Sequence, residues 1–207
     1  MRHRIPALLV LALCAALSAC GGDTDSNEPA SEGPFAPSGS ASPGVTMIDP
    51  PADYTTISGE GFAISAPGEF QQRRATSSNG EPMLVLEKPS QVPAIPQRVA
   101  VIRDVDPKSP AEEQSFALET SKAAAGSEAS VERVAMPAPE GQSAFLTTWT
   151  EIRPGEGSDN VPVTYWQLMH QVEEDLILNV VAYAPADEFE MSEVSKILRT
   201  FVPGADA

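Results

Sequence analysis

Cysteine and histidine are nearly absent from this sequence, which removes the side chains most used in nucleophilic catalysis and metal binding. The 207 residues include two cysteines and two histidines. Cys14 and Cys20 both lie near the start, so no disulfide is expected in the rest of the chain, even in a compartment that would permit one. A folded domain of this chain therefore depends on its hydrophobic core for stability.

No catalytic constellation is visible either. His170 is the one histidine beyond His3, and a lone histidine without a partner motif is far more often structural or exposed than catalytic. The segment around Ser143 lacks the final glycine of a nucleophile elbow, and nothing positions a serine against His170 for a triad. We therefore expect a protein that is not an enzyme and uses no cofactor.

Positive charge is also scarce. Lys and Arg number 13 against 29 Asp and Glu, which gives a formal net charge of −16 at pH 7. Nucleic-acid binding depends on cationic patches, and binding flat on an anionic membrane depends on clusters of Lys and Arg, so neither is expected. An acidic surface favours solubility, and it speeds association with a partner that presents basic side chains.

Two acidic segments invite comparison with calcium sites. Asp104 and Asp106 begin like a calcium loop, but Ser109 and Ser115 stand where the loop requires a glycine and a bidentate glutamate. The loop at residues 154–160 offers further oxygen atoms, at no known ligand spacing. We interpret Asp104 and Asp106 as strand-end and turn residues, and the second loop as a solvated turn. We therefore expect no metal site.

The beginning of the chain has the order of a secretory signal peptide. Arg2 and Arg4 form a short basic region, and residues 5–17 are almost wholly apolar. This apolar run is shorter than the ~20 residues that a membrane-spanning helix needs, so a permanent transmembrane helix is the weaker interpretation. We expect residues 1–19 to be removed on export.

Leu17, Ser18, Ala19 and Cys20 resemble the lipobox of bacterial lipoproteins. In proteins of that kind the cysteine thiol receives a diacylglycerol, and a peptidase then cleaves before it. The resemblance implies a mature chain that starts at Cys20 and is held by lipid to the extracytoplasmic face of a cell membrane, where two acyl chains give stable anchoring. The alternative is an ordinary signal peptide cut nearby, which would leave Cys20 as a free thiol.

Residues 20–52 differ in composition from the rest of the chain. They are rich in Gly, Ser, Pro, Ala, Asp and Glu, and they hold too few large apolar side chains to bury much surface. We expect a flexible linker with a root-mean-square reach of roughly 30 Å, by the rule of 5–6 Å × √n. One domain is expected at residues 53–207, a normal size for a single core.

Alternating apolar residues and turn signals predict an antiparallel sheet. The expected strands cover residues 61–65, 70–76, 83–87, 99–105, 131–136, 144–152, 161–172 and 176–183. The first two are expected to pair through a tight turn at Gly68, and Asn79-Gly80 indicates the next hairpin. Residues 176–182 are almost continuously apolar, which predicts a central strand covered on both faces.

Two helices are expected against this sheet. The first covers residues 109–125, with Ser109 as its N-cap and a capping box formed with Glu112. The second is amphipathic, begins with Asp187 as its cap and ends before Pro203. The predicted fold class is α+β: a single domain in which an antiparallel β-sheet is flanked by helices.

Three short motifs carry a resemblance to a known family. They are GFAISAP at residues 61–67, YAP at residues 183–185 and ILRTF at residues 197–201. Together with the order of elements, they resemble the Mog/PsbP-like fold, an α/β/α sandwich, and more narrowly the LpqN-type lipoproteins of actinobacterial envelopes. The resemblance covers residues 53–201. It implies a non-catalytic envelope adaptor or accessory protein that binds another envelope protein.

A second interpretation stays open beside the adaptor. A lipid-anchored carrier of a lipid or small hydrophobic ligand is similar in length, and a long apolar cavity would favour it. Trp149, Tyr165 and Trp166 lie on neighbouring expected strands and are a candidate patch for a ligand or partner. Packing in the core is the alternative role of these three rings, because large aromatic side chains dominate cores.

Substituting Cys20→Ser is expected to abolish membrane anchoring. The only other apolar segment is removed or too short to remain in a bilayer. Incorporation of radiolabelled palmitate and membrane fractionation measure this directly. Equal labelling of the variant and the parent protein would contradict the prediction.

Overall fold

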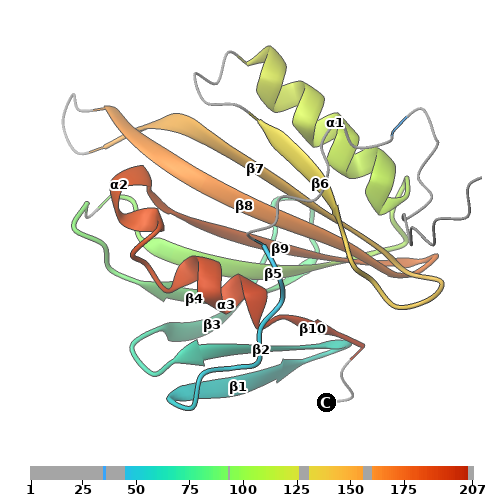
Figure 1. The fold of residues 1–207 in the computed structure, drawn as a ribbon, viewed down its shortest axis with the longest axis horizontal. Helices are drawn as coiled ribbons and strands as arrows, with labels where there is room; N and C mark the ends of the chain where they lie inside the picture. Colours follow the sequence, from blue (N-terminus) through green and yellow to red (C-terminus); the bar gives the residue numbers. More distant parts are fainter. Residues whose placement is uncertain (1–34, 36–44, 93, 126–130, 156–159, 205–207) are drawn as a thin grey trace, which may run out of the picture. The chain divides into compact units, whose positions relative to one another are not determined.

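A seven-stranded antiparallel sheet forms the centre of the domain (Figure 1). The computed structural model describes residues 35, 45–92, 94–125, 131–155 and 160–204. The sheet has the order β3-β4-β5-β9-β8-β7-β6. Its strands are β3 Gln71–Thr76, β4 Pro82–Lys88, β5 Gln97–Val105, β6 Glu132–Met136, β7 Ser143–Pro154, β8 Asn160–Glu173 and β9 Leu176–Pro185. The expected signal peptide and Cys20 lie outside the described residues.

A second, three-stranded sheet has the order β1-β2-β10. Its strands are β1 Tyr54–Gly59, β2 Phe62–Pro67 and β10 Val202–Pro203. The expected pairing of residues 61–65 with residues 70–76 is wrong, because β2 pairs with β1 and β3 pairs with β4. The turn between β2 and β3 sends the chain from one sheet to the other. β1 went unpredicted because its sequence, TTISG after Tyr54, is polar and alternates weakly.

The central position of β9 is confirmed. β9 is hydrogen-bonded to β5 on one side and to β8 on the other. Ile177 faces one side of the sheet and packs with Ala111, Phe145 and Met169, whereas Leu178 faces the other side. Both side chains of this pair are 0% exposed. The continuous apolar run was therefore the correct signal for a strand covered on both faces.

Helices cover the two faces of the large sheet. Helix α1, Ala111–Ala124, packs mainly on β7, and helix α3, Val194–Arg199, packs on β9 and β5 from the opposite face (Figure 1). Together with a short helix α2, Ala186–Phe189, this arrangement is the α+β domain that the sequence predicted. In the described part of the chain, no helix is long and apolar enough to cross a membrane.

The predicted cap of α1 is wrong. The helix begins after Pro110, and no side chain of the first turn caps it. The amide of Ala111 instead donates to Oε1 of Gln171 at 2.8 Å, so the cap comes from β8, 60 residues along the chain. The expected stop at Gly126 lies outside the described residues.

The predicted C-terminal helix is two helices. α2 ends where Ser192 donates from both its amide and its hydroxyl to the carbonyl of Phe189, and α3 begins two residues later. Asp187 forms no cap, because the helix begins after Pro185. At the end of α3, the Thr200 hydroxyl accepts from the amide of Ser65 at 2.9 Å. This bond joins the end of α3 to β2 in the small sheet.

Part of the expected linker contacts the domain. Val45 packs against the main core, Arg199 donates from Nε to the carbonyl of Thr46 at 2.6 Å, and the amide of Ile48 donates to the Arg199 carbonyl at 2.9 Å. The described structure of the domain therefore begins ahead of the expected boundary at Asp53.

The Gly59→Ala variant is expected to destabilise the domain by about 1–3 kcal/mol through overpacking. The ring of Phe62 lies across Gly59, so an added Cβ would stand 2.2 Å from its Cζ. Gly68→Ala is the matched control, because an added Cβ there meets nothing within 4 Å. Urea unfolding of both variants measures the difference, and equal stabilities would show that Phe62 moves aside freely.

Candidate functional site

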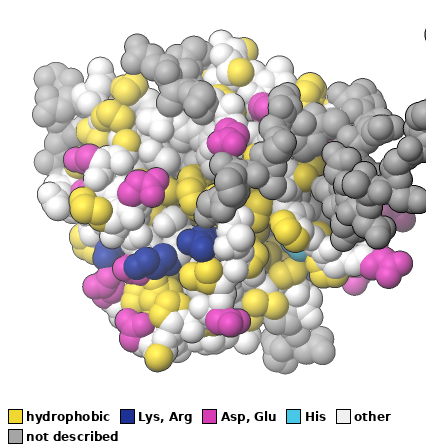
Figure 2. Space-filling view, in the orientation of Figure 1, with side chains coloured by type: hydrophobic (Ala, Val, Ile, Leu, Met, Phe, Trp, Pro, Cys, Tyr) yellow, Lys and Arg dark blue, Asp and Glu magenta, His cyan; other side chains and the backbone are white. Residues whose placement is uncertain are grey.

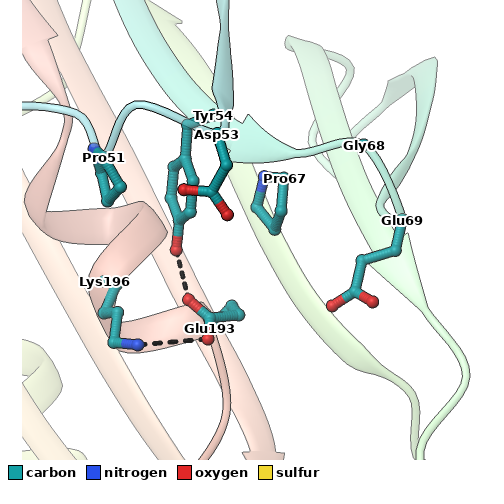
Figure 3. A pocket seen from close by; sticks show the side chains of 8 residues that line it. All are labelled: Pro51, Asp53, Tyr54, Pro67, Gly68, Glu69, Glu193 and Lys196. Atoms are coloured by element: carbon teal, nitrogen blue, oxygen red, sulfur yellow. Dashed lines mark hydrogen bonds and ion pairs between the residues drawn. The ribbon is translucent and has the colours of Figure 1, made fainter.

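The candidate site is a groove of about 410 Å³ between the small sheet and α3. Asp53 and Tyr54 reach it from the start of β1, Glu69 from the turn after β2, and Glu193 and Lys196 from α3 and the residue before it. Figure 3 shows Tyr54 pointing at Glu193, with the rings of Pro51 and Pro67 on either side of Tyr54. The wall of the groove thus combines carboxylates with flat apolar surfaces.

One hydrogen-bond chain organises the groove. The Tyr54 hydroxyl donates to Oε2 of Glu193, and Nζ of Lys196 lies 3.1 Å from Oε1 of the same carboxylate (Figure 3). Burial and the neighbouring carboxylates raise the pKa of Tyr54. Burial opposes ionisation of Glu193, but the bonds from Tyr54 and Lys196 outweigh it and lower its pKa. At neutral pH the tyrosine is therefore a fixed donor and Glu193 a fixed anion.

Negative charge exceeds positive charge along the groove. Glu69 is paired with Lys88 at 2.6 Å, and Glu193 is paired with Lys196. Asp53 makes no hydrogen bond or ion pair with any described residue, and its side chain is exposed. None of the described lining residues is a Cys, His, Ser or Thr. The excess of carboxylates makes the groove suited to holding a cationic group, which would replace one of the existing cation partners.

Carboxylates also gather elsewhere, where Asp106, Glu173, Glu174 and Asp175 line a second open space. In Figure 2, acidic side chains are scattered over the visible face, whereas the Lys and Arg side chains seen there form one small group. The net charge of −16 is therefore a property of the whole chain, and the groove is one place where carboxylates face a shared space.

The structure divides the predicted aromatic patch. Trp149 and Tyr165 are directly paired across β7 and β8, and their rings stack at 5.0 Å between centroids with an interplanar angle of 2°. Trp166 points to the opposite face of the sheet, where it packs against Phe189. The single patch of three rings is therefore wrong, because side chains of successive strand residues alternate between faces.

The two stacked rings belong to a longer row that sequence reasoning missed. Tyr183 of β9 lies 5.2 Å from Tyr165, the guanidinium of Arg98 lies over Tyr183, and Lys122 lies over Trp149. Trp149 is 5% exposed and Tyr165 is 8% exposed. Packing across the strands is thus the role that the geometry supports. The alternation of side chains along any strand could have placed Tyr183 on one face together with Val181 and Asn179, once the pairing with β8 was known.

His170 lies inside the domain. It is 4% exposed, and its Nε2 lies 2.6 Å from Oε1 of Gln142. Burial lowers its pKa to about 4, so the ring is neutral at pH 7 and Nε2 donates to the amide oxygen. No described acid or nucleophile bonds to it, which fits a structural histidine.

The first acidic segment forms the end of β5 and the bend that follows it. Asp104 accepts from Nε2 of Gln114 at 3.1 Å, and Asp106 has a left-handed φ of 56° while its amide donates to the carbonyl of Asp175. Residues 156–159 of the other loop lie outside the described residues. Across the described ranges, no three His, Cys, Asp or Glu side chains are close enough together to hold a metal ion.

Comparison with known proteins gives a similarity of fold. No family model matches the chain, and no curated protein matches it. Among solved structures, it is similar to the cyanobacterial PsbP (CyanoP) from Synechocystis sp. PCC 6803, at 12% sequence identity and a TM-score of 0.47. The match covers 74% of this chain and 94% of that chain. A similarity at this level carries no information about binding or activity.

Stability is expected to fall by about 2 kcal/mol between pH 7 and pH 5 because of His170. Its pKa of about 4 in the folded state is lower than the ordinary 6.5 of an unfolded chain. The contribution is therefore complete above pH 6.5 and is lost as the pH falls from 6.5 towards 4. Urea unfolding at the two pH values measures the change. An NMR titration in which the His170 ring protonates near pH 6.5 would contradict it.

Proposed function

We propose that this protein is a lipid-anchored envelope adaptor of the LpqN type, whose groove at Tyr54 binds a basic segment of another envelope protein. Lipid on Cys20 would hold the chain at the extracytoplasmic face of the membrane. The observation that carries the proposal is the groove itself: three carboxylates on three separate elements face one space, and one of them, Asp53, has no described partner.

A Lys or Arg side chain fits these walls in two ways. Its aliphatic stem is suited to lying against Tyr54 and the proline rings, while its charged end meets Asp53 or Glu69. The fixed bond from Tyr54 to Glu193 keeps one wall in place, so little side-chain entropy is lost on binding. Such a contact is exposed and small, and it sets the rate and specificity of association more than its strength.

Anchoring and charge act together in this proposal. A domain tethered near its partner meets it at a raised effective concentration. The acidic chain attracts basic surfaces over roughly one Debye length, ~10 Å at 0.1 M salt. An association rate that falls as salt rises, with a smaller change in dissociation, is the kinetic signature of this kind of encounter.

The groove is tested by placing a photo-crosslinking residue at Gly68, where added side-chain atoms meet nothing within 4 Å. Crosslinking in intact cells is expected to trap a protein partner from this position and not from Glu113, an exposed position on α1. Equal capture from both positions would place the interface elsewhere. A lipid that co-purifies at one per domain, with no crosslinked protein, would replace the adaptor by a carrier of a hydrophobic ligand.

With the captured partner, Asp53→Asn is expected to slow association ~2- to 5-fold, the effect of one exposed ion pair. Glu113→Gln removes the same charge away from the groove and is expected to leave the rate nearly unchanged. Binding kinetics at 50 and 300 mM salt measure both variants. Equal slowing by the two variants would mean that net charge acts without the groove.

A further inference from the structure

A second cavity, of about 100 Å³, opens between the two sheets on the side of the domain where β1 turns into β2. The side chains of Phe62, Leu84 and Val101 give it an apolar lining. All three are almost completely buried: Phe62 at 3%, Leu84 at 8% and Val101 at 1% exposure. Its deep part is therefore rigid core surface, because these side chains also belong to the main hydrophobic cluster.

Two arginines line the same cavity. Arg74 of β3 is paired across the sheet with Leu84, and Leu84 is paired with Val101, so the three side chains share one face. Arg103 stands two residues after Val101 on β5, and it therefore lies on that face as well. The strand register therefore places the guanidinium groups of Arg74 and Arg103 beside the apolar lining.

These guanidinium groups keep unused donors. Nη1 of Arg103 donates to Oε2 of Glu60 at 2.9 Å, but its buried Nε has no hydrogen-bond partner in the described part of the chain. A buried donor without a partner costs stability, more so on a charged group. Arg74 forms no hydrogen bond or ion pair with a described residue. The partner Glu60 is itself 79% exposed, so it is free to leave Arg103 at little cost.

The geometry points to a binding site for a short aliphatic carboxylic acid in this cavity, with its carboxylate on Arg103 and Arg74. A carboxylate oxygen accepts from guanidinium N–H groups in a planar, often paired arrangement. The cavity has room for about three water molecules at roughly 30 Å³ each, and hence for a short branched carbon chain. Locally the site has two cations against one exposed carboxylate, the reverse of the chain as a whole.

This proposal is independent of the adaptor groove, and it is tested with isovalerate as the probe. NMR of the full chain, labelled at its leucine and valine methyl groups, is expected to show the Leu84 and Val101 signals shifting on titration, while the signals of Val134 and Val163 on distant strands stay in place. Dissociation constants in the range of ~1 mM are expected for so small a ligand. Isovaleramide, which keeps the carbon chain and loses the charge, is expected to bind at least tenfold more weakly.

Neighbouring arginines of one strand provide a matched pair of variants. Arg74→Gln is expected to weaken isovalerate binding about fivefold or more, for one lost charged contact. Arg73→Gln removes the same charge from the other face of β3 and is expected to change it little. Arg103→Lys keeps the charge but loses the paired donors, and it is also expected to weaken binding. Equal binding of the amide, equal effects of the two glutamine variants, or unmoved Leu84 and Val101 signals would overturn the proposal.

Discussion

The pairing of β5 with β9 is the contact on which the rest of the domain depends. The N-terminal half contributes β3, β4 and β5 to the large sheet, and the C-terminal half contributes β6 to β9. Eight residue pairs, from Arg98 with Tyr183 to Val105 with Leu176, join the two halves of the large sheet. β9 also receives α3 on one face, and α3 in turn holds the small sheet through Thr200. Loss of this ladder would divide the large sheet into two parts.

Elements whose signals are local were predictable. Asn79-Gly80 places the β3–β4 hairpin, and the apolar run at residues 176–182 places the central strand. Elements that depend on contacts with residues far along the chain were not predictable. Helix α1 is capped by Gln171 from β8, and β1 is a strand because β2 offers it a ladder, with little help from its own side chains. The local sequence also predicted Ser109 as a cap, but in the structure the amide of Ala111 donates to Gln171.

The candidate groove shows the same limit more sharply. Tyr54 and Glu193 are 139 residues apart, and neither belongs to a recognisable motif. Only the folded chain brings the start of β1 next to α3. The aromatic patch failed for the opposite reason: Trp149, Tyr165 and Trp166 are close in any antiparallel hairpin, but the period of 2 separates adjacent residues onto two faces. The hairpin pattern therefore predicted correctly that the two strands are neighbours. It predicted incorrectly that all three rings lie on one face of the sheet.

The groove and the cavity lie at opposite ends of one short hairpin. Tyr54 is paired with Pro67 at the end beside the groove, and Gly59 is paired with Phe62 at the end beside the cavity. Five residue steps of ~3.3 Å separate the two ends by roughly 17 Å. This exceeds the Debye length of ~10 Å at 0.1 M salt, so charge bound at one end scarcely alters the potential at the other. The carboxylates at one end would attract cations and the arginines at the other would attract anions, so the ligands proposed for the two sites would not compete.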